Sequence, residues 1–184
     1  MKAVTVGALL LIMTGTTSRA QGQADSGIAA AVVAIDQIDE LRSSLAGTFL
    51  QTGAPAGKQA FAEVCRPVGQ AMKDAGRQHG WVGRQLAVKY RNPANAADPE
   101  ATRILGLFER DSSLLAVTLR TYLNGQPGRR YLRRITVEAS CLLCHGARDA
   151  RPAFVREQYA DDRAFDFRAG DLRGAYSVFI PDGR

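Results

Sequence analysis

The sequence predicts an α+β domain in which helices come first and an antiparallel β-sheet follows. Three observations lead to this class. Apolar residues recur at spacings of three and four over residues 31–49 and again over 61–72, which is typical of amphipathic helices. In the second half of the chain apolar and polar residues alternate, as they do in strands with one buried face. The turn signal Asn124-Gly125 between two such segments indicates antiparallel neighbours.

The two N-terminal helices are predicted from apolar stripes and from breaker residues. The stripe of the first helix consists of Ala31, Ala34, Ile38, Leu41, Leu45 and Phe49. Gly53-Ala54-Pro55 is a cluster of helix breakers, so we expect the first helix to end there. The stripe of the second helix consists of Phe61, Cys65, Val68 and Met72. Pro67 cannot donate a backbone hydrogen bond, so we expect a kink or a new helix start just beyond Cys65.

A third helix is predicted at Asp98-Pro99-Glu100, because aspartate caps helices well and proline is favoured at the first helical position. We expect it to run through Phe108 and to end near residues 111–113.

The remaining regular elements are predicted to be strands. Alternation places one strand at Leu86, Val88 and Tyr90 and the last at Tyr176, Val178 and Ile180. Between them, residues 117–123 and 131–137 read as a hairpin around Asn124-Gly125. Pro127 and Gly128 lead us to expect a loop longer than two residues in this hairpin.

The N-terminus predicts a leader for export. Met1-Lys2 precedes an almost uninterrupted apolar segment at residues 3–13, and Ser18-x-Ala20 supplies a cleavage site. The apolar core of roughly 10 residues is too short to span a bilayer, although an uncleaved anchor is the alternative interpretation. We therefore expect a signal peptide at residues 1–20, a single domain at residues 21–184, a periplasmic location and no stable membrane insertion after cleavage.

The charge pattern argues against nucleic acid as a partner. The formal net charge is +6, and cleavage of the leader removes Lys2 and Arg19 without removing an acid. The arginines are scattered along the chain, and we expect their one cluster, at residues 129–134, on a solvated strand face.

The segment Cys141-Leu142-Leu143-Cys144-His145 is the motif that indicates a chemistry. The spacing C-x-x-C-H is the attachment signature of c-type haem. It suits that purpose because two thiols three positions apart each add to one vinyl group of the porphyrin, while the histidine is delivered to the iron. The pattern is rare by chance in a chain with three cysteines and two histidines. We therefore predict one covalently attached haem c held by Cys141, Cys144 and His145.

Two other interpretations of the cysteines are weaker. A thioredoxin-like redox pair also has the spacing C-x-x-C, but it follows a strand in a βαβ unit and does not need the adjacent histidine. A zinc site would recruit Cys65, Cys141, Cys144 and His145, yet the neighbouring residues 144 and 145 would have to converge on one small tetrahedron.

The motif leaves the second axial ligand of the iron open. The candidate donors after the leader are Cys65, Met72 and His79. A methionine on an apolar helical face usually fills a core, and His79 lies beside Gly80 at a predicted helix end. Cys65 is slightly favoured, because a lone thiol in an oxidising compartment is a hazard unless it is buried or bound to metal.

Three further segments, together with the motif, give the chain a family resemblance. They are Trp81-Val82-Gly83-Arg84, Lys89-Tyr90-Arg91-Asn92-Pro93-Ala94-Asn95 and Gly170-Asp171-Leu172-Arg173-Gly174-Ala175. With residues 141–146 they resemble the PAS-like haem c domain of bacterial exported proteins and sensor ectodomains, over nearly all of the chain after the leader. The resemblance implies N-terminal helices followed by a PAS-like antiparallel β-sheet, with the haem held by C-x-x-C-H.

The resemblance also implies iron ligands. A member of this family uses a histidine and a cysteine as the axial pair, with the thiolate on the second helix, and Cys65 matches that position. His145 and Cys65 are then the expected metal ligands, and a thiolate ligand predicts a low redox potential. Arg173 is expected to bind the haem as the partner of a propionate, with a salt bridge inside its own loop as the alternative.

The expected function is redox or gas sensing through a separate redox or signalling protein, with a small gas as a candidate ligand. A simple periplasmic electron carrier is the first alternative. A peroxidase-like haem enzyme is the second alternative, but the sequence offers no convincing distal histidine or arginine pair for acid–base catalysis.

Overall fold

The computed structural model describes residues 16–55 and 57–183, with side chains described from Ser26 onward. The leader predicted at residues 1–20 therefore lies mostly outside the described residues and stays a prediction. The helices are α1 (Thr16–Gln51), α2 (Lys58–Ala60), α3 (Arg66–His79), α4 (Pro99–Arg110), α5 (Leu142–His145) and α6 (Ala153–Gln158). The strands are β1 (Val82–Leu86), β2 (Ala116–Leu123), β3 (Gln126–Thr136) and β4 (Leu172–Pro181). Short helical turns of other types are η1 (Phe61–Cys65), η2 (Pro93–Asn95), η3 (Ala139–Cys141) and η4 (Arg148–Ala150).

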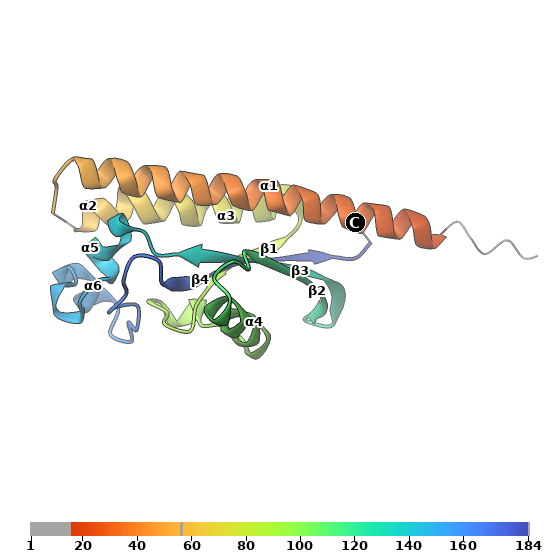
Figure 1. Cartoon of the computed structure of the whole chain (residues 1–184). Helices are drawn as coiled ribbons and strands as arrows, with labels where there is room; N and C mark the ends of the chain where they lie inside the picture. Colours follow the sequence, from red (N-terminus) through yellow and green to blue (C-terminus); the bar gives the residue numbers. More distant parts are fainter. Residues whose placement is uncertain (1–15, 56, 184) are drawn as a thin grey trace, which may run out of the picture.

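The sheet is antiparallel throughout, in the order β1-β4-β3-β2. The two long helices α1 and α3 lie side by side along one face, and α4 covers the other (Figure 1). The α+β class with helices first is confirmed, in an arrangement consistent with a PAS-like fold. Within residues 16–55 and 57–183, no helix is both long and apolar enough to cross a membrane.

Successive side chains of the central strands supply two separate cores, as strand geometry requires. On the α1 and α3 face the buried core consists of Ala31, Ile35, Ile38, Val68, Met72, Tyr131, Ile135, Tyr176, Val178 and Ile180. On the α4 face it consists of Leu86, Ala101, Leu105, Phe108, Leu132 and Ala175. The sheet is therefore buried on both sides at β3 and β4.

The predicted second helix consists of three pieces. After α2, residues Phe61–Cys65 form a π-helical turn, and α3 begins at Arg66 with Pro67 in its first turn. The expected irregularity just beyond Cys65 is thus found as a change from π-helix to α-helix, and the backbone stays helical through Cys65 and Arg66. The prediction of one buried apolar stripe is wrong for Phe61 and Cys65, which are not part of the buried core and line a pocket, whereas Val68 belongs to the core and borders the same pocket.

Helix α4 and the hairpin follow the sequence signals closely. Asp98 caps α4 by accepting a 2.8 Å hydrogen bond from the backbone N–H of Ala101. Asn124 and Gly125 both have positive φ (52° and 78°), and Leu123 pairs directly with Gln126, so the loop has two residues. The prediction of a loop longer than two residues is therefore wrong. Pro127 fits inside β3 because its pairing with β4 begins only at Gly128, so its missing N–H is not needed.

The strand expected at Leu86, Val88 and Tyr90 is wrong beyond its first residue. Strand β1 ends at Leu86, and Ala87 then bonds through its backbone to Asn95 and Ala97. The chain therefore leaves the sheet and carries the following residues toward the pocket.

The arginine cluster at residues 129–134 also differs from expectation. Arg134 is buried and donates to the carbonyl of Ser112 just past the end of α4, while Arg130 pairs with Asp98 and Glu100. A solvated strand face is therefore wrong for these two side chains, which instead join α4 to β3.

Candidate functional site

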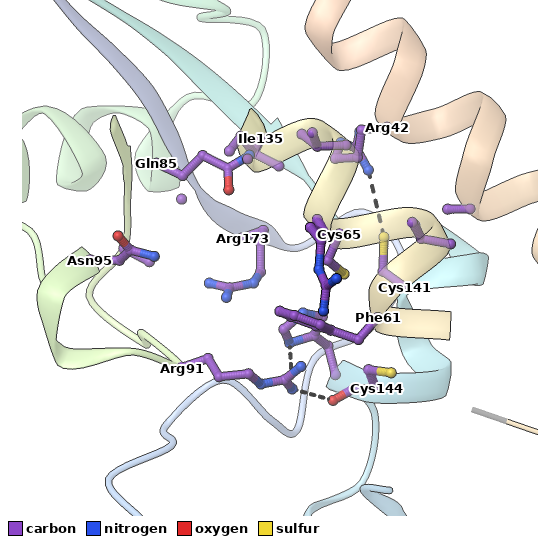
Figure 2. Close-up of a pocket in the computed structure, with 18 of the residues that line it drawn as sticks. Arg42, Phe61, Cys65, Gln85, Arg91, Asn95, Ile135, Cys141, Cys144 and Arg173 are labelled. Carbon is purple, nitrogen blue, oxygen red and sulfur yellow. Dashed lines mark hydrogen bonds between the residues drawn. The ribbon is translucent and has the colours of Figure 1, made fainter. Parts of the chain in front are cut away.

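A pocket of about 430 Å³ lies between the end of the sheet, the π-helical turn and α5 (Figure 2). Its volume is in the range of cofactor sites. All five predicted site residues line it, although they are far apart in the sequence: Cys65, Cys141, Cys144, His145 and Arg173. The other ligand candidates lie elsewhere. Met72 is buried in the core on the α1 face, and His79 stacks on Trp81 with ring centroids 4.1 Å apart.

The C-x-x-C-H motif lies on two short helical turns, η3 and α5, that follow β3. Arg42 of α1 holds the start of the motif, because it donates to Cys141 Sγ (3.6 Å) and pairs with Glu138 (2.7 Å). Gly146 ends the motif, and a Cβ at this position would lie 2.7 Å from the carbonyl oxygen of Leu142. Glycine therefore permits the tight turn that directly follows His145.

Residues 164–167 orient the His145 ring. Its Nδ1 lies 2.8 Å from the carbonyl oxygen of Ala164 and 3.3 Å from Nη2 of Arg91. The carbonyl is the nearer partner and only accepts hydrogen bonds, so we assign the proton to Nδ1. Nε2 then keeps the lone pair that a metal requires. Phe167 contacts the imidazole edge to face, with centroids 6.2 Å apart. Burial first, then the charges of Arg173 and Arg91, lower the pKa of His145 well below its usual range, which favours the neutral ring.

Cys65 lies at the end of the π-helical turn, and its exposed surface faces the pocket. Burial among neighbouring groups, with a smaller contribution from Cys144, raises the pKa of the Cys65 thiol to about 11, against the opposing charge of Arg91. The thiol is therefore neutral by itself at pH 7. Coordination to a metal would deprotonate it.

Arg91, Arg151 and Asp162 form a network of ion pairs and hydrogen bonds next to the motif. Arg91 donates to the carbonyl of Cys144, and its Nε lies 3.5 Å from Oδ1 of the fully buried Asp162. Oδ2 of the same carboxylate accepts a 2.8 Å hydrogen bond from Arg151. This network links the loop after β1, the motif and the segment before Phe167.

Arg173 enters the pocket from β4. It donates to the carbonyl of Lys89 (3.0 Å), while Asp171 accepts from the backbone N–H of Arg168. Burial, and after it the charge of Arg91, lowers the pKa of Arg173 to about 10. Arg173 was expected at the site, whereas Arg91 was not. The only sequence signal for Arg91 was its place in the segment of residues 89–95 that contributed to the family resemblance.

The donor set suits a planar cofactor that brings its own equatorial ligands. Two motif thiols, one neutral imidazole and a third thiol surround a single cavity, and a porphyrin needs no more than these for two thioether bonds and two axial bonds. Among the residues that the structure describes, no three His, Cys, Asp or Glu side chains are arranged to hold a bare metal ion.

Comparisons with known proteins agree with this geometry. A family model described as Tll0287-like matches residues 20–181. Among solved structures, the chain resembles the cyanobacterial haem protein Tll0287, with 42% sequence identity and a TM-score of 0.74. The alignment covers 85% of this chain and 96% of that one. The comparison with curated proteins found no match.

Proposed function

This chain belongs to the Tll0287-like family, and from that premise we propose that it is an exported redox protein with one covalent haem c in the pocket. The observation that carries the proposal is the convergence of Cys141, Cys144, His145 and Cys65 on one cavity. Further support comes from the 42% identity to a haem protein.

Each of these residues has a role that its surroundings support. Cys141 and Cys144 supply the sulfur atoms of the two thioethers. His145 presents Nε2 because its Nδ1–H is held by the carbonyl of Ala164. Cys65 supplies the second axial ligand, since Met72 and His79 do not line the pocket. When bound, the haem supplies one-electron exchange between ferric and ferrous iron.

We propose that the protein senses redox state or a small gas and reports to a separate protein. The supporting feature is the π-helical turn that ends at Cys65, because π-helical turns are rare and recur at functional sites. Simple electron transfer is the alternative role.

The test of haem attachment is the purified protein from a host with haem c maturation machinery. We expect the mass of the chain to rise by that of one haem, and the ferric protein to give a low-spin electron paramagnetic resonance signal of thiolate type. Cys65→Ala should lose the thiolate signal and keep the haem. Met72→Leu is the matched control, because Met72 lies in the core, and it should keep both. A colourless protein at its bare peptide mass would overturn the proposal.

Reduction separates the two roles. A sensor with a labile Cys65 should lose its thiolate ligand on reduction and bind carbon monoxide, with a new band in the visible spectrum. Unchanged axial ligation on reduction, with no carbon monoxide adduct, would instead identify an electron carrier.

A further inference from the structure

The loop that follows β1 holds the segment that follows the C-x-x-C-H motif. Lys89 Nζ donates a hydrogen bond to the carbonyl of Phe165. One residue further along the loop, the carbonyl of Tyr90 accepts a 2.8 Å hydrogen bond from the backbone N–H of Arg163. The residue between Arg163 and Phe165 supplies the carbonyl oxygen that lies 2.8 Å from His145 Nδ1. The loop therefore anchors the acceptor of the imidazole N–H on both of its sides.

Phe167 is the residue at which the same segment contacts the His145 ring. The two rings lie edge to face, with centroids 6.2 Å apart and an angle of 85° between their planes. The backbone N–H of Phe167 also donates to the carbonyl of His145 (3.1 Å). Only 8% of Phe167 is exposed, so its ring is packed in place. The position of Phe167 therefore limits the planes that the imidazole can adopt.

Two cations lie over the ring of Phe167. Lys89 Nζ is 4.2 Å from the ring centroid, and the guanidinium carbon of Arg173 is 5.6 Å from it. The attraction between a cation and an aromatic face falls with distance, so Lys89 is the stronger partner. Arg173 in turn donates to the carbonyl of Lys89. Lys89 thus joins the carbonyl of Phe165, the ring of Phe167 and the guanidinium of Arg173.

We propose that Lys89 is a positioning residue for the axial histidine, because it holds Phe167 and thereby fixes the plane of the His145 ring. This inference rests on the haem function proposed above. Groups around a metal-bound histidine that fix its orientation tune the metal. The plane matters because the π orbital of an imidazole stands perpendicular to the ring, overlaps one of two iron d orbitals and separates their energies. A single plane gives low-spin ferric iron one narrow set of g values.

The first test is electron paramagnetic resonance of the haem-loaded ferric protein and of its variant Lys89→Met, which keeps a long side chain and loses the ammonium group. We expect the g values to shift and their lines to broaden, because the imidazole then adopts several planes. Lys89→Arg should restore the wild-type spectrum, since a guanidinium also lies over aromatic rings and donates to carbonyls. Wild-type g values and line widths in Lys89→Met would overturn the inference.

The matched control for this test is Lys58→Met. Lys58 is exposed on α2 and does not line the pocket. The control removes the same charge from the protein, so it should leave the g values and line widths unchanged. A shift in Lys58→Met as large as that in Lys89→Met would overturn the inference, because net charge would then explain both.

The second test determines whether Lys89 acts through Phe167. Phe167→Leu removes the ring and keeps the charge of Lys89, and it should also shift and broaden the g values. In the double variant Lys89→Met/Phe167→Leu, the loss of Lys89 should add a smaller shift than it does in the wild-type background, as expected for residues that act together. An equal added shift in both backgrounds would overturn the inference. Absence of haem from the matured wild-type chain would instead refute the proposed function, so the two failures are distinguishable.

Discussion

At the scale of single residues, Asp39 joins α1 to the sheet. Its carboxylate accepts hydrogen bonds from Arg42 (3.0 Å), from Arg133 of β3 (2.7 Å) and from the Tyr176 hydroxyl of β4 (3.1 Å). Burial by itself would raise the pKa of Asp39, but the charge of Arg42 and the hydrogen bonds from Arg133 and Arg42 outweigh it and hold this pKa below the ordinary 3.8. The folded state therefore binds this proton less tightly than the unfolded chain does.

We expect Asp39→Asn to lower the free energy of unfolding at neutral pH by about 1–3 kcal/mol, because charged hydrogen-bond partners lose their acceptor. A depressed folded pKa means that the carboxylate contributes fully above the unfolded value and loses its contribution as the pH falls through the folded value. The difference between wild type and variant should thus be constant near neutral pH and shrink below about pH 4. Urea unfolding at a series of pH values measures it.

The control for this prediction is Asp74→Asn on the exposed face of α3, where the only ion pair described is with Arg77. It should change stability by less than about 0.5 kcal/mol at any pH. A difference between wild type and Asp39→Asn that persists undiminished in acid would show that the Asp39 carboxylate is not held in its charged form.

The residues of the site differ in how far sequence alone could identify them. Cys141, Cys144 and His145 could be selected as candidates because their signal is a local spacing, and the structure brings them to the pocket. Cys65 was selected through the scarcity of donors and the family resemblance, and it lines the same pocket. Arg91 was missed because its role arises from contacts with Asp162 and the carbonyl of Cys144, which lie far along the chain.

At the scale of elements, β3 and β4 approach so closely at Gly128 that only glycine fits. A Cβ there would lie 2.4 Å from the carbonyl oxygen of Ile180 and 2.6 Å from the Phe179 ring. Gly47 of α1 is the opposite case, because a Cβ there would meet nothing within 4 Å. The two glycines therefore have opposite consequences for stability.

We expect Gly128→Ala to lower the free energy of unfolding by about 1–3 kcal/mol through overpacking. Gly47→Ala should raise it by about 0.5–1 kcal/mol, since alanine restricts the unfolded chain and favours the helix. Chemical unfolding of both variants and of the wild type shows directly whether each change lowers or raises the free energy of unfolding. Wild-type stability in Gly128→Ala would contradict the close approach of β3 and β4.

Elements with a complete local signal were predictable, and elements shaped by neighbours were not. Helix α4 has its cap at Asp98, and β4 has its alternation, so both were placed correctly. The chain leaves the sheet at Ala87 through backbone bonds to Asn95 and Ala97, which the alternation of apolar residues does not contain. The π-helical turn likewise has no counterpart in the apolar spacing, which is the same for an α-helix. Pro127 led to the wrong prediction of a longer loop, because a proline is tolerated in β3 only where the strand does not yet pair with β4, and the sequence does not show where that pairing begins.

At the scale of the whole molecule, the sheet and the wall of the pocket differ in the size of their buried cores. The segment between β3 and β4 carries the motif and packs around a third, small cluster of Val137, Ala164 and Phe167, with Cys141 and Leu142 beside it. Its helices α5 and α6 are short, with four and six residues. The buried cluster of this segment has three residues, against ten and six in the two cores of the sheet, and regions with a small core open at a lower free energy than a main core.

A haem tethered at Cys141 and Cys144 and bound to Cys65 would connect this segment to the π-helical turn across the pocket. We therefore expect residues 139–168 to exchange backbone hydrogen quickly in the haem-free Cys141→Ala/Cys144→Ala chain and much more slowly in the haem-loaded wild type, because a group that binds only the folded state stabilises it. Hydrogen–deuterium exchange followed by mass spectrometry resolves the segment. Helix α4 packs on the far face of the sheet and serves as the internal control, since its local exchange should change least. Equal slowing in α4 and in residues 139–168 would show that the haem acts on global stability alone. The segment of residues 139–168 would then not unfold separately from the rest of the protein.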